Sequence, residues 1–236
     1  ISACLVGSEM CIRDRSDDDD DFDEVDYVTA EVLRDRLCLD LDLHHAGEDI
    51  RCLNNIASPV QTIRDTLMLM PRDTPEQLDM LRSRLSKVPA SLSGYKESLI
   101  EAASRGMVAP QRQISEVFVQ SERLADAGSM LEDLGLDADS AEVVKAKEAF
   151  GEFADWLSNE LQPQAPSQDA VGRERYERFS KLFVGDAVDL DEAYEWGLEQ
   201  VRSIKAEQEK IAHQLYGSDV TVRAAMRKLN EEERYQ

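Results

Sequence analysis

The sequence predicts an all-α fold, arranged as an antiparallel array of helices. Glycine (11) and proline (7) are scarce among the 236 residues, and apolar residues recur at spacings of three and four, the period of one helix face. No segment alternates apolar and polar residues with period two over a useful length. Short connections between helices favour antiparallel neighbours. Both ends of the chain look cut, so we interpret the array as an incomplete portion of a larger helical domain.

The N-terminal segment differs from the rest of the chain. Residues 1–15, ISACLVGSEMCIRDR, are similar to translated sequencing-adapter strings that contaminate metagenomic protein predictions. A genuine strand or a signal-peptide remnant is the alternative. An acidic run over residues 17–21 follows and lacks the turn glycine of a calcium loop. We therefore predict that residues 1–23 are unstructured, with Leu5 and Val6 outside the core.

The first helix is expected over about residues 25–46, where apolar side chains share one face until Gly47 interrupts the pattern. A polar segment over residues 48–57 follows. Two helices then begin at a proline that directly follows a hydroxyl residue, at Ser58–Pro59 and at Thr74–Pro75. Proline suits the first helical position, and the preceding oxygen can accept from orphan amides. We predict that the oxygens of Ser58 and Thr74 each accept from a backbone amide of the first turn.

Proline also marks the next two helix starts, at Pro89 and Pro110. Residues 128–139 are predicted to form a loop, after which Ser140 caps a longer helix that ends near Leu161. A short helix over residues 173–183 is expected next. A long helix then opens at Asp189 and carries an apolar stripe over residues 197–215 that is broken by one glutamine. One more helix is expected around residues 222–229.

The domain organisation follows from this order of elements. We expect an artefactual or unstructured N-terminus over residues 1–23 and a helical region over residues 24–161. A linker-like loop over residues 162–170 contains QPQAPS. Residues 171–236 are expected to continue the helical region of the same domain.

Charge and composition exclude several classes of partner. The formal net charge is −22, from 49 acidic and 27 basic residues, and such a field repels nucleic acid and anionic membrane surfaces. Cationic proteins fit better, although a solvated surface is the simpler interpretation. No apolar run approaches the ~20 residues of a membrane helix. The four cysteines form no CxxC pair, so a reducing, cytoplasmic compartment is the default expectation. Nothing in the pattern specifies an oligomeric state.

Catalytic and metal motifs are not found. His44 and Glu48 have the i, i+4 spacing of a helical metal site, but the zincin motif needs two histidines at that spacing, with a glutamate beside the first. Gly47 also interrupts the helix between them. His213 stands alone, and no GxSxG elbow, Walker loop or GxGxxG occurs. The sequence therefore assigns no catalytic, cofactor-binding or metal-binding residue.

One polar segment, LNNIASPVQTIRD over residues 53–65, is a candidate binding element. Asn54, Asn55, Gln61 and Arg64 gather where one turn ends and a helix begins. Amides and an arginine beside a helix N-terminus can hold a carboxylate or a peptide backbone. The alternative is that the two asparagines end one turn and cap the next element.

Several segments together resemble one bacterial family, the domain of unknown function 885. They are YVTAEVLRDRL, HAGEDIRCLNNIASPVQTIRDTLMLMPRDT, VPASLSGYKESL, DAVGRERYERF and VDLDEAYEWGLEQVRSI. The resemblance covers the N-terminal half of the family, from about residue 24 to 230. It implies helical, zincin-like metallopeptidases with a histidine–glutamate signature in their C-terminal half. This chain contains no histidine–glutamate pair, so no catalytic residue is carried over.

The resemblance implies that this half supplies the helical wall of a substrate channel, with Asn54, Asn55, Gln61 and Arg64 in its lining. Zinc and a peptide substrate would belong to the full-length protein. We therefore expect a truncated metallopeptidase-like hydrolase, inactive as it stands, whose gene continues past Gln236. The alternative is a non-enzymatic acidic helical binding module that recruits cationic partners. The genomic DNA on both sides of the reading frame distinguishes the two.

Overall fold

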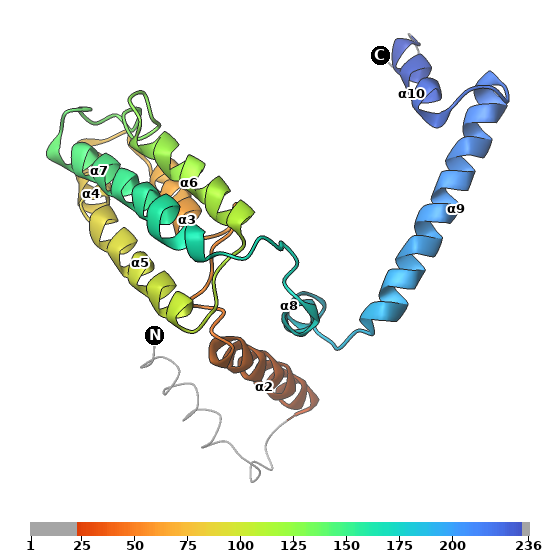
Figure 1. Ribbon diagram of the computed structural model, residues 1–236, viewed down its shortest axis with the longest axis horizontal. Coiled ribbons are helices and arrows are strands. Elements are labelled where there is room, and N and C mark those ends of the chain that lie inside the picture. Colours follow the sequence, from red (N-terminus) through yellow and green to blue (C-terminus); the bar gives the residue numbers. More distant parts are fainter. Residues whose placement is uncertain (1–22, 233–236) are drawn as a thin grey trace. The chain divides into compact units, whose positions relative to one another are not determined.

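Residues 23–232 are described by the computed structural model, and within that range the chain is helical, without strands (Figure 1). The predicted all-α class is confirmed. The prediction that residues 1–23 are unstructured lies outside the described residues, apart from Asp23. The chain divides after Val171 into two compact units, which in the described range are residues 23–171 and 172–232.

The first helix, α2 (Glu24–His45), begins at a strong cap. Asp23 accepts from two first-turn amides at 2.8 and 2.9 Å, which satisfies two donors that have no partner inside the helix. Gly47 lies just beyond the end of α2, with a φ of +71°, a backbone conformation that favours glycine. Leu39 is buried, whereas most apolar side chains of α2 are exposed.

Two helices begin at the predicted prolines, α3 (Pro59–Leu69) and α4 (Pro75–Leu85). The predicted cap of α4 is confirmed. Thr74 Oγ1 accepts from the amide of Gln77 at 3.3 Å, and Gln77 Oε1 accepts from the amide of Thr74 at 3.2 Å. The two residues thus satisfy each other's orphan amides, which is the capping-box arrangement.

The start of α3 has the capping-box arrangement of Ser58 and Gln61, and the Ser58 hydroxyl makes a further bond. The hydroxyl of Ser58 donates to Oε1 of Gln61, and the same oxygen accepts from the Ser58 amide at 2.8 Å. Both residues are buried. One side-chain carbonyl therefore satisfies two donors that water does not reach, which is how buried polar groups are normally accommodated.

The next three helices are α5 (Val88–Ser104), α6 (Gln111–Ala125) and α7 (Ala141–Trp156). Helix α7 packs against α6, α5 and α4, and Figure 1 shows α6 and α7 lying side by side. The amide of Gln111 donates to the carbonyl of Pro166 at 3.0 Å. Because the start of α6 meets the chain that follows α7, the two helices are antiparallel, as predicted for neighbouring helices.

The start of α7 differs from expectation, whereas helical conformation continues to the expected Leu161 at the other end. Ser140 stands at its N-cap position, but the predicted cap bond is missing, and the buried Ser140 Oγ has no hydrogen-bond partner among the described residues. At its other end the helix continues as a π-helical turn, Leu157–Leu161, and a 3-10 turn, Gln162–Gln164. Gln162 Nε2 donates to Ser115 Oγ of α6 at 2.8 Å, so the predicted linker begins with residues that are bonded to the helical core.

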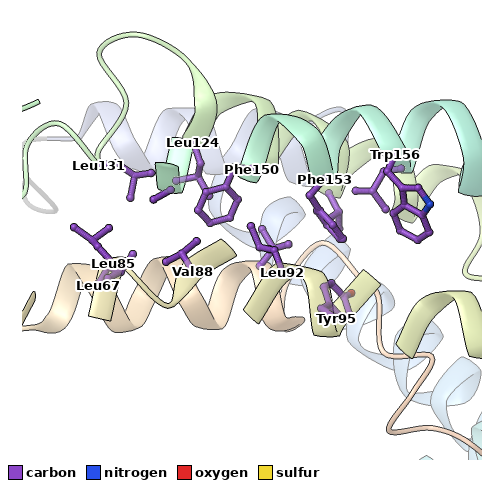
Figure 2. Packing of buried hydrophobic residues seen from close by; sticks show 14 of the residues in the cluster. Leu67, Leu85, Val88, Leu92, Tyr95, Leu124, Leu131, Phe150, Phe153 and Trp156 are labelled. Carbon is purple, nitrogen blue, oxygen red and sulfur yellow. The ribbon is translucent and has the colours of Figure 1, made fainter. Parts of the chain in front are cut away.

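Buried side chains from α3 to α7 form one apolar core (Figure 2). Phe150 is fully buried on α7. Phe153 lies between Tyr95 and Trp156, with ring centroids 5.4 and 5.8 Å away, separations at which aromatic pairs attract. These rings and the leucines around them hold the first unit together.

The segment between α6 and α7 was predicted to be a loop, and it contains no helix. It nevertheless contributes Leu131, Leu134 and Leu136 to the core. Burial of one leucine side chain stabilises a fold by about 1.5–3 kcal/mol, so these leucines hold the loop on the core. The chain immediately after α6 is therefore held in place.

The second unit consists of α8 (Arg173–Val184), α9 (Leu190–Tyr216) and α10 (Val222–Glu231). Arg173 donates from its two Nη atoms to the carboxylate of Asp191 at 3.0 and 2.9 Å, which joins α8 to α9. Helix α10 packs against α9. The predicted apolar stripe of α9 is exposed within the described residues, with Val201 63% accessible. No helix in residues 23–232 is both long and apolar enough to cross a membrane.

Candidate functional site

Asn54 is engaged in the turn that precedes α3. Its Oδ1 accepts from the amides of Ile56 at 2.9 Å and Ala57 at 2.7 Å, and its Nδ2 donates to the Ala57 carbonyl at 2.9 Å. Asparagine side chains form such bonds to nearby backbone in turns. The side chain of Asn54 thus shapes the entry to α3.

Asn55 joins this turn to α6 through its backbone. Its amide donates to Gln113 Oε1 at 2.9 Å, and its carbonyl accepts from Gln120 Nε2 at 3.0 Å. The residue is exposed, and its side-chain amide has no bonded partner among the described residues. Two glutamines on one helix therefore hold the turn, and the Asn55 side chain itself faces no fixed partner.

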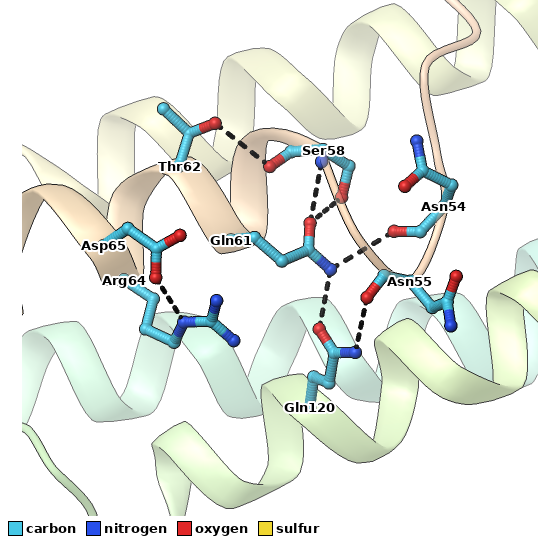
Figure 3. A network of polar contacts seen from close by, with 8 residues as sticks. All are labelled: Asn54, Asn55, Ser58, Gln61, Thr62, Arg64, Asp65 and Gln120. Carbon is cyan, nitrogen blue, oxygen red and sulfur yellow. Dashed lines mark hydrogen bonds and ion pairs between the residues drawn. The ribbon is translucent and has the colours of Figure 1, made fainter.

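Gln61 is the centre of the polar network, and it is only 2% exposed. Its Oε1 accepts both donors of Ser58, as described above. Its Nε2 donates to the Asn54 carbonyl at 3.2 Å and to Gln120 Oε1 at 2.6 Å. Figure 3 shows Gln61 reaching from α3 to both groups. A single buried amide thus fixes the start of α3 against the turn and against α6.

The segment before this network is anchored from the other side by Tyr95 of α5. The Tyr95 hydroxyl donates to the Cys52 carbonyl at 2.7 Å. Burial raises the pKa of Tyr95 far above its ordinary value of 10.0, because the charged phenolate is poorly solvated there. The hydroxyl therefore keeps its proton at neutral pH and remains a donor to the backbone.

Arg64 lies one turn beyond Gln61 on α3 and is partly exposed. Its Nε donates to Asp65 Oδ1 at 2.7 Å (Figure 3). This hydrogen bond holds the pKa of the Asp65 carboxyl below its ordinary value of 3.8. Asp65 therefore stays ionised at neutral pH and orients the guanidinium from its Nε edge.

A recess with a volume of about 460 Å³ lies beside this network. Its walls come from α3, from α6 and from the first residues after α6, all within the first unit. The lining residues are Val60, Arg64, Gln120, Arg123, Leu124, Asp126, Ala127, Gly128, Ser129 and Met130. Spacings of three and four place Val60 with Arg64 on one face of α3, and Gln120 with Arg123 and Leu124 on one face of α6.

Of the four residues predicted to line a binding site, the structure places Arg64 in the recess. Gln61 is not a lining residue but donates to Gln120, which is one. Asn54 and Asn55 belong to the turn before α3, and the Asn55 carbonyl accepts from Gln120. Arg123 and Ser129 also line the recess, but the sequence analysis did not predict them as site residues. Arg123 carried no signal of its own because an arginine on an amphipathic helix is usually a solvated residue, and Ser129 falls in the segment predicted to be a loop.

The segment that contains His44, His45 and Glu48 does not bring several possible metal ligands together. His44 Nδ1 lies 2.8 Å from Asp49 Oδ2, while Glu48 is buried and lies 3.9 Å from Arg51. Over residues 23–232 the structure contains no group of three or more histidine, cysteine, aspartate or glutamate residues able to hold a metal ion.

One known protein family matches nearly the whole chain. The model of a family described as "Bacterial protein of unknown function (DUF885)" matches residues 12–236. The chain belongs to this family. The resemblance found in the sequence is therefore confirmed at the level of the family, while the relation to metallopeptidases remains a prediction. A search of curated proteins gave no match.

Proposed function

We propose that this chain is the non-catalytic helical part of a metallopeptidase-like hydrolase and that the face formed by α3 and α6 holds the substrate. The observation that carries the proposal is the recess between these helices, which contains Arg64 from the family-like segment LNNIASPVQTIRD. The chain belongs to a bacterial family whose description gives no function. The resemblance to zincin-like peptidases supplies the reaction class.

The polar network gives this face the rigidity that substrate binding needs. Gln61 bonds to Asn54, Ser58 and Gln120 at once. A side chain binds its ligand best when packing and hydrogen bonds from neighbouring residues fix its position. The turn, α3 and α6 are joined in this way, and Arg64 projects from that fixed frame.

The chemistry would be supplied by residues outside this chain. Zinc hydrolysis needs three protein ligands and an open position for water, together with a glutamate that activates the bound water. We propose that these groups lie in a second helical half, encoded beyond Gln236 and marked by a histidine–glutamate segment.

Recovery of the source DNA tests this proposal. We expect the reading frame to continue past Gln236 and to encode a histidine–glutamate pair with a further histidine a few residues on. The extended protein should hydrolyse peptides, lose that activity with a chelator and regain it with zinc. The chain ending at Gln236 should show no hydrolysis in the same assay. A stop codon directly after Gln236 in clean DNA would contradict the proposal.

The stop-codon result would favour a non-enzymatic acidic binding module. The specific observation behind that alternative is the net charge of −22, which attracts cationic proteins. Binding of a basic peptide that weakens steeply with added salt would support it.

A further inference from the structure

We propose that the recess between α3 and α6 binds a carboxylate attached to a short apolar group, such as the C-terminal residue of a peptide. The inference rests on the proposed function in that it names the ligand class of the same recess, but its test measures binding alone and is independent of hydrolysis. It rests on the shape of the recess, on two arginines and on one buried hydroxyl.

The size and the lining residues of the recess fit a small, partly apolar ligand. Its volume of about 460 Å³ lies in the range of ligand pockets, roughly 300–1,000 Å³. Its lining includes Val60 and Leu124, which are buried, and Met130, which is partly buried. An apolar side chain could lie against these three residues while its polar end meets an arginine of the lining.

Two arginines, Arg64 and Arg123, line the recess. Asp65 occupies the Nε edge of Arg64, and the two Nη atoms of Arg64 have no partner among the described residues. The Arg123 side chain likewise makes no ion pair or hydrogen bond within residues 23–232. Guanidinium binds carboxylate with two parallel hydrogen bonds, and this geometry favours carboxylates over neutral groups.

Ser129 provides an independent indication of a ligand. It lines the recess, is only 6% exposed, and its Oγ has no hydrogen-bond partner in the described part of the chain. Buried hydroxyls are normally bonded, so an orphan hydroxyl at a recess requires an explanation. Because the Oγ itself is buried, a carboxylate oxygen beside Arg123 would accept from this hydroxyl once the Ser129 side chain turns toward the recess.

The recess is also lined by one acidic residue, Asp126, whose charge is opposite to that of the two arginines. Its side chain has no bonded partner among the described residues. Its carboxylate repels an anionic ligand. Removing that charge should therefore strengthen binding of a carboxylate, whereas removing an arginine should weaken it. This opposite response separates carboxylate recognition from general loss of structure.

The test uses the full chain and two probes, N-acetyl-alanyl-leucine and its C-terminal amide. Binding is followed by ¹⁵N-resolved NMR and by calorimetry. We expect the acid to bind in a saturable manner, with shifts at Gly128 and Ser129, and the amide to bind at least about tenfold more weakly. Arg123→Gln and Arg64→Gln should each weaken binding of the acid by about tenfold, and Asp126→Asn should strengthen it.

Arg84→Gln is the matched control, because Arg84 is an exposed arginine of α4 outside the recess. It removes the same charge from the chain and should leave binding of the acid unchanged. Circular dichroism establishes that each variant is folded. Equal binding of acid and amide would overturn the proposal. So would an equal effect of Arg84→Gln and Arg123→Gln, weaker binding in Asp126→Asn, or no saturable binding of the acid at millimolar concentration.

Discussion

Replacement of Gln61 by leucine removes the centre of the polar network while keeping most of the side-chain volume. Gln61 is 2% exposed and makes four hydrogen bonds, two with Ser58, one with the Asn54 carbonyl and one with Gln120. Leucine can make none of them. The buried amide and hydroxyl of Ser58 would lose their acceptor, whereas Asn54 and Gln120 are partly exposed and can turn to water.

The size of the effect follows from these partners. A buried donor left without an acceptor costs about 1–3 kcal/mol, and an ordinary exposed hydrogen bond contributes about 0.5–1.5 kcal/mol. The amide and hydroxyl of Ser58 are the main loss, because both belong to a buried residue that water does not reach. We expect Gln61→Leu to lower the free energy of unfolding by about 2–4 kcal/mol.

Gln77→Leu is a matched control. Gln77 stands at the same third position of α4 and accepts from the Thr74 amide at 3.2 Å, but both residues reach solvent. We expect this change to cost only about 1 kcal/mol or less. The two substitutions thus differ mainly in the burial of the groups left behind.

Urea unfolding followed by fluorescence of Trp156 measures both effects. Trp156 lies in the core and is 5% exposed, whereas Trp196 on α9 is 64% exposed. A Trp196→Phe background therefore restricts the signal to the first unit. If Gln61→Leu destabilises this unit no more than Gln77→Leu does, the buried network does not stabilise the start of α3, and the reasoning fails.

Three further predictions concern the helix cap, the core and pH. Thr74→Ala should lower the free energy of unfolding by roughly 1 kcal/mol, measured by urea titration; no change would contradict the cap. Phe150 is fully buried, so Phe150→Ala should cost about 3–5 kcal/mol and lower the Tm; a Tm unchanged from the parent would refute its place in the core. A hydrogen bond from Lys147 holds the pKa of Glu132 below its ordinary value of 4.5. The ion pair of Glu132 and Lys147 therefore contributes its full stabilisation above pH 4.5, the ordinary pKa of glutamate in the unfolded chain. This stabilisation is lost as the pH falls through the lower pKa of Glu132 in the folded protein. Glu132→Gln should flatten the fall of Tm in acid, and an unchanged acid profile would show that the pair contributes nothing.

Helix starts were predictable from sequence because the groups that fix them are local. Thr74 and Gln77 are three residues apart and satisfy each other's backbone, so the pattern contains the whole interaction. The same holds for Asp189, which accepts from the amides of Asp191 and Glu192 at the start of α9. The all-α class follows from many such local signals.

The site was only partly predictable because its contacts join distant residues. Gln61 and Gln120 are 59 residues apart in the chain, and no local pattern indicates which face of α6 meets α3. The sequence did place Asn54, Gln61 and Arg64 near one another, since they belong to one turn and one helix. It did not indicate that Arg123 completes a recess with Arg64.

The segment between α6 and α7 shows a second limit. Its leucines have no helical context, so the sequence predicts only that residues 128–139 form a loop. Leu131 and Leu134 are nevertheless fully buried, because the loop folds back over the core. Tertiary packing of this kind depends on the arrangement of the helices, which periodicity does not report.

The proposed function is tested most directly by steady-state kinetics of the proposed longer protein. These kinetics show whether the α3–α6 face binds substrate without taking part in the chemical step. The change is Arg123→Gln, with Arg84→Gln as control. We predict that Arg123→Gln raises KM by about tenfold and leaves kcat within about twofold, the signature of lost uniform binding. A fall in kcat at unchanged KM would contradict the account, because it would place Arg123 in the transition state rather than in substrate binding.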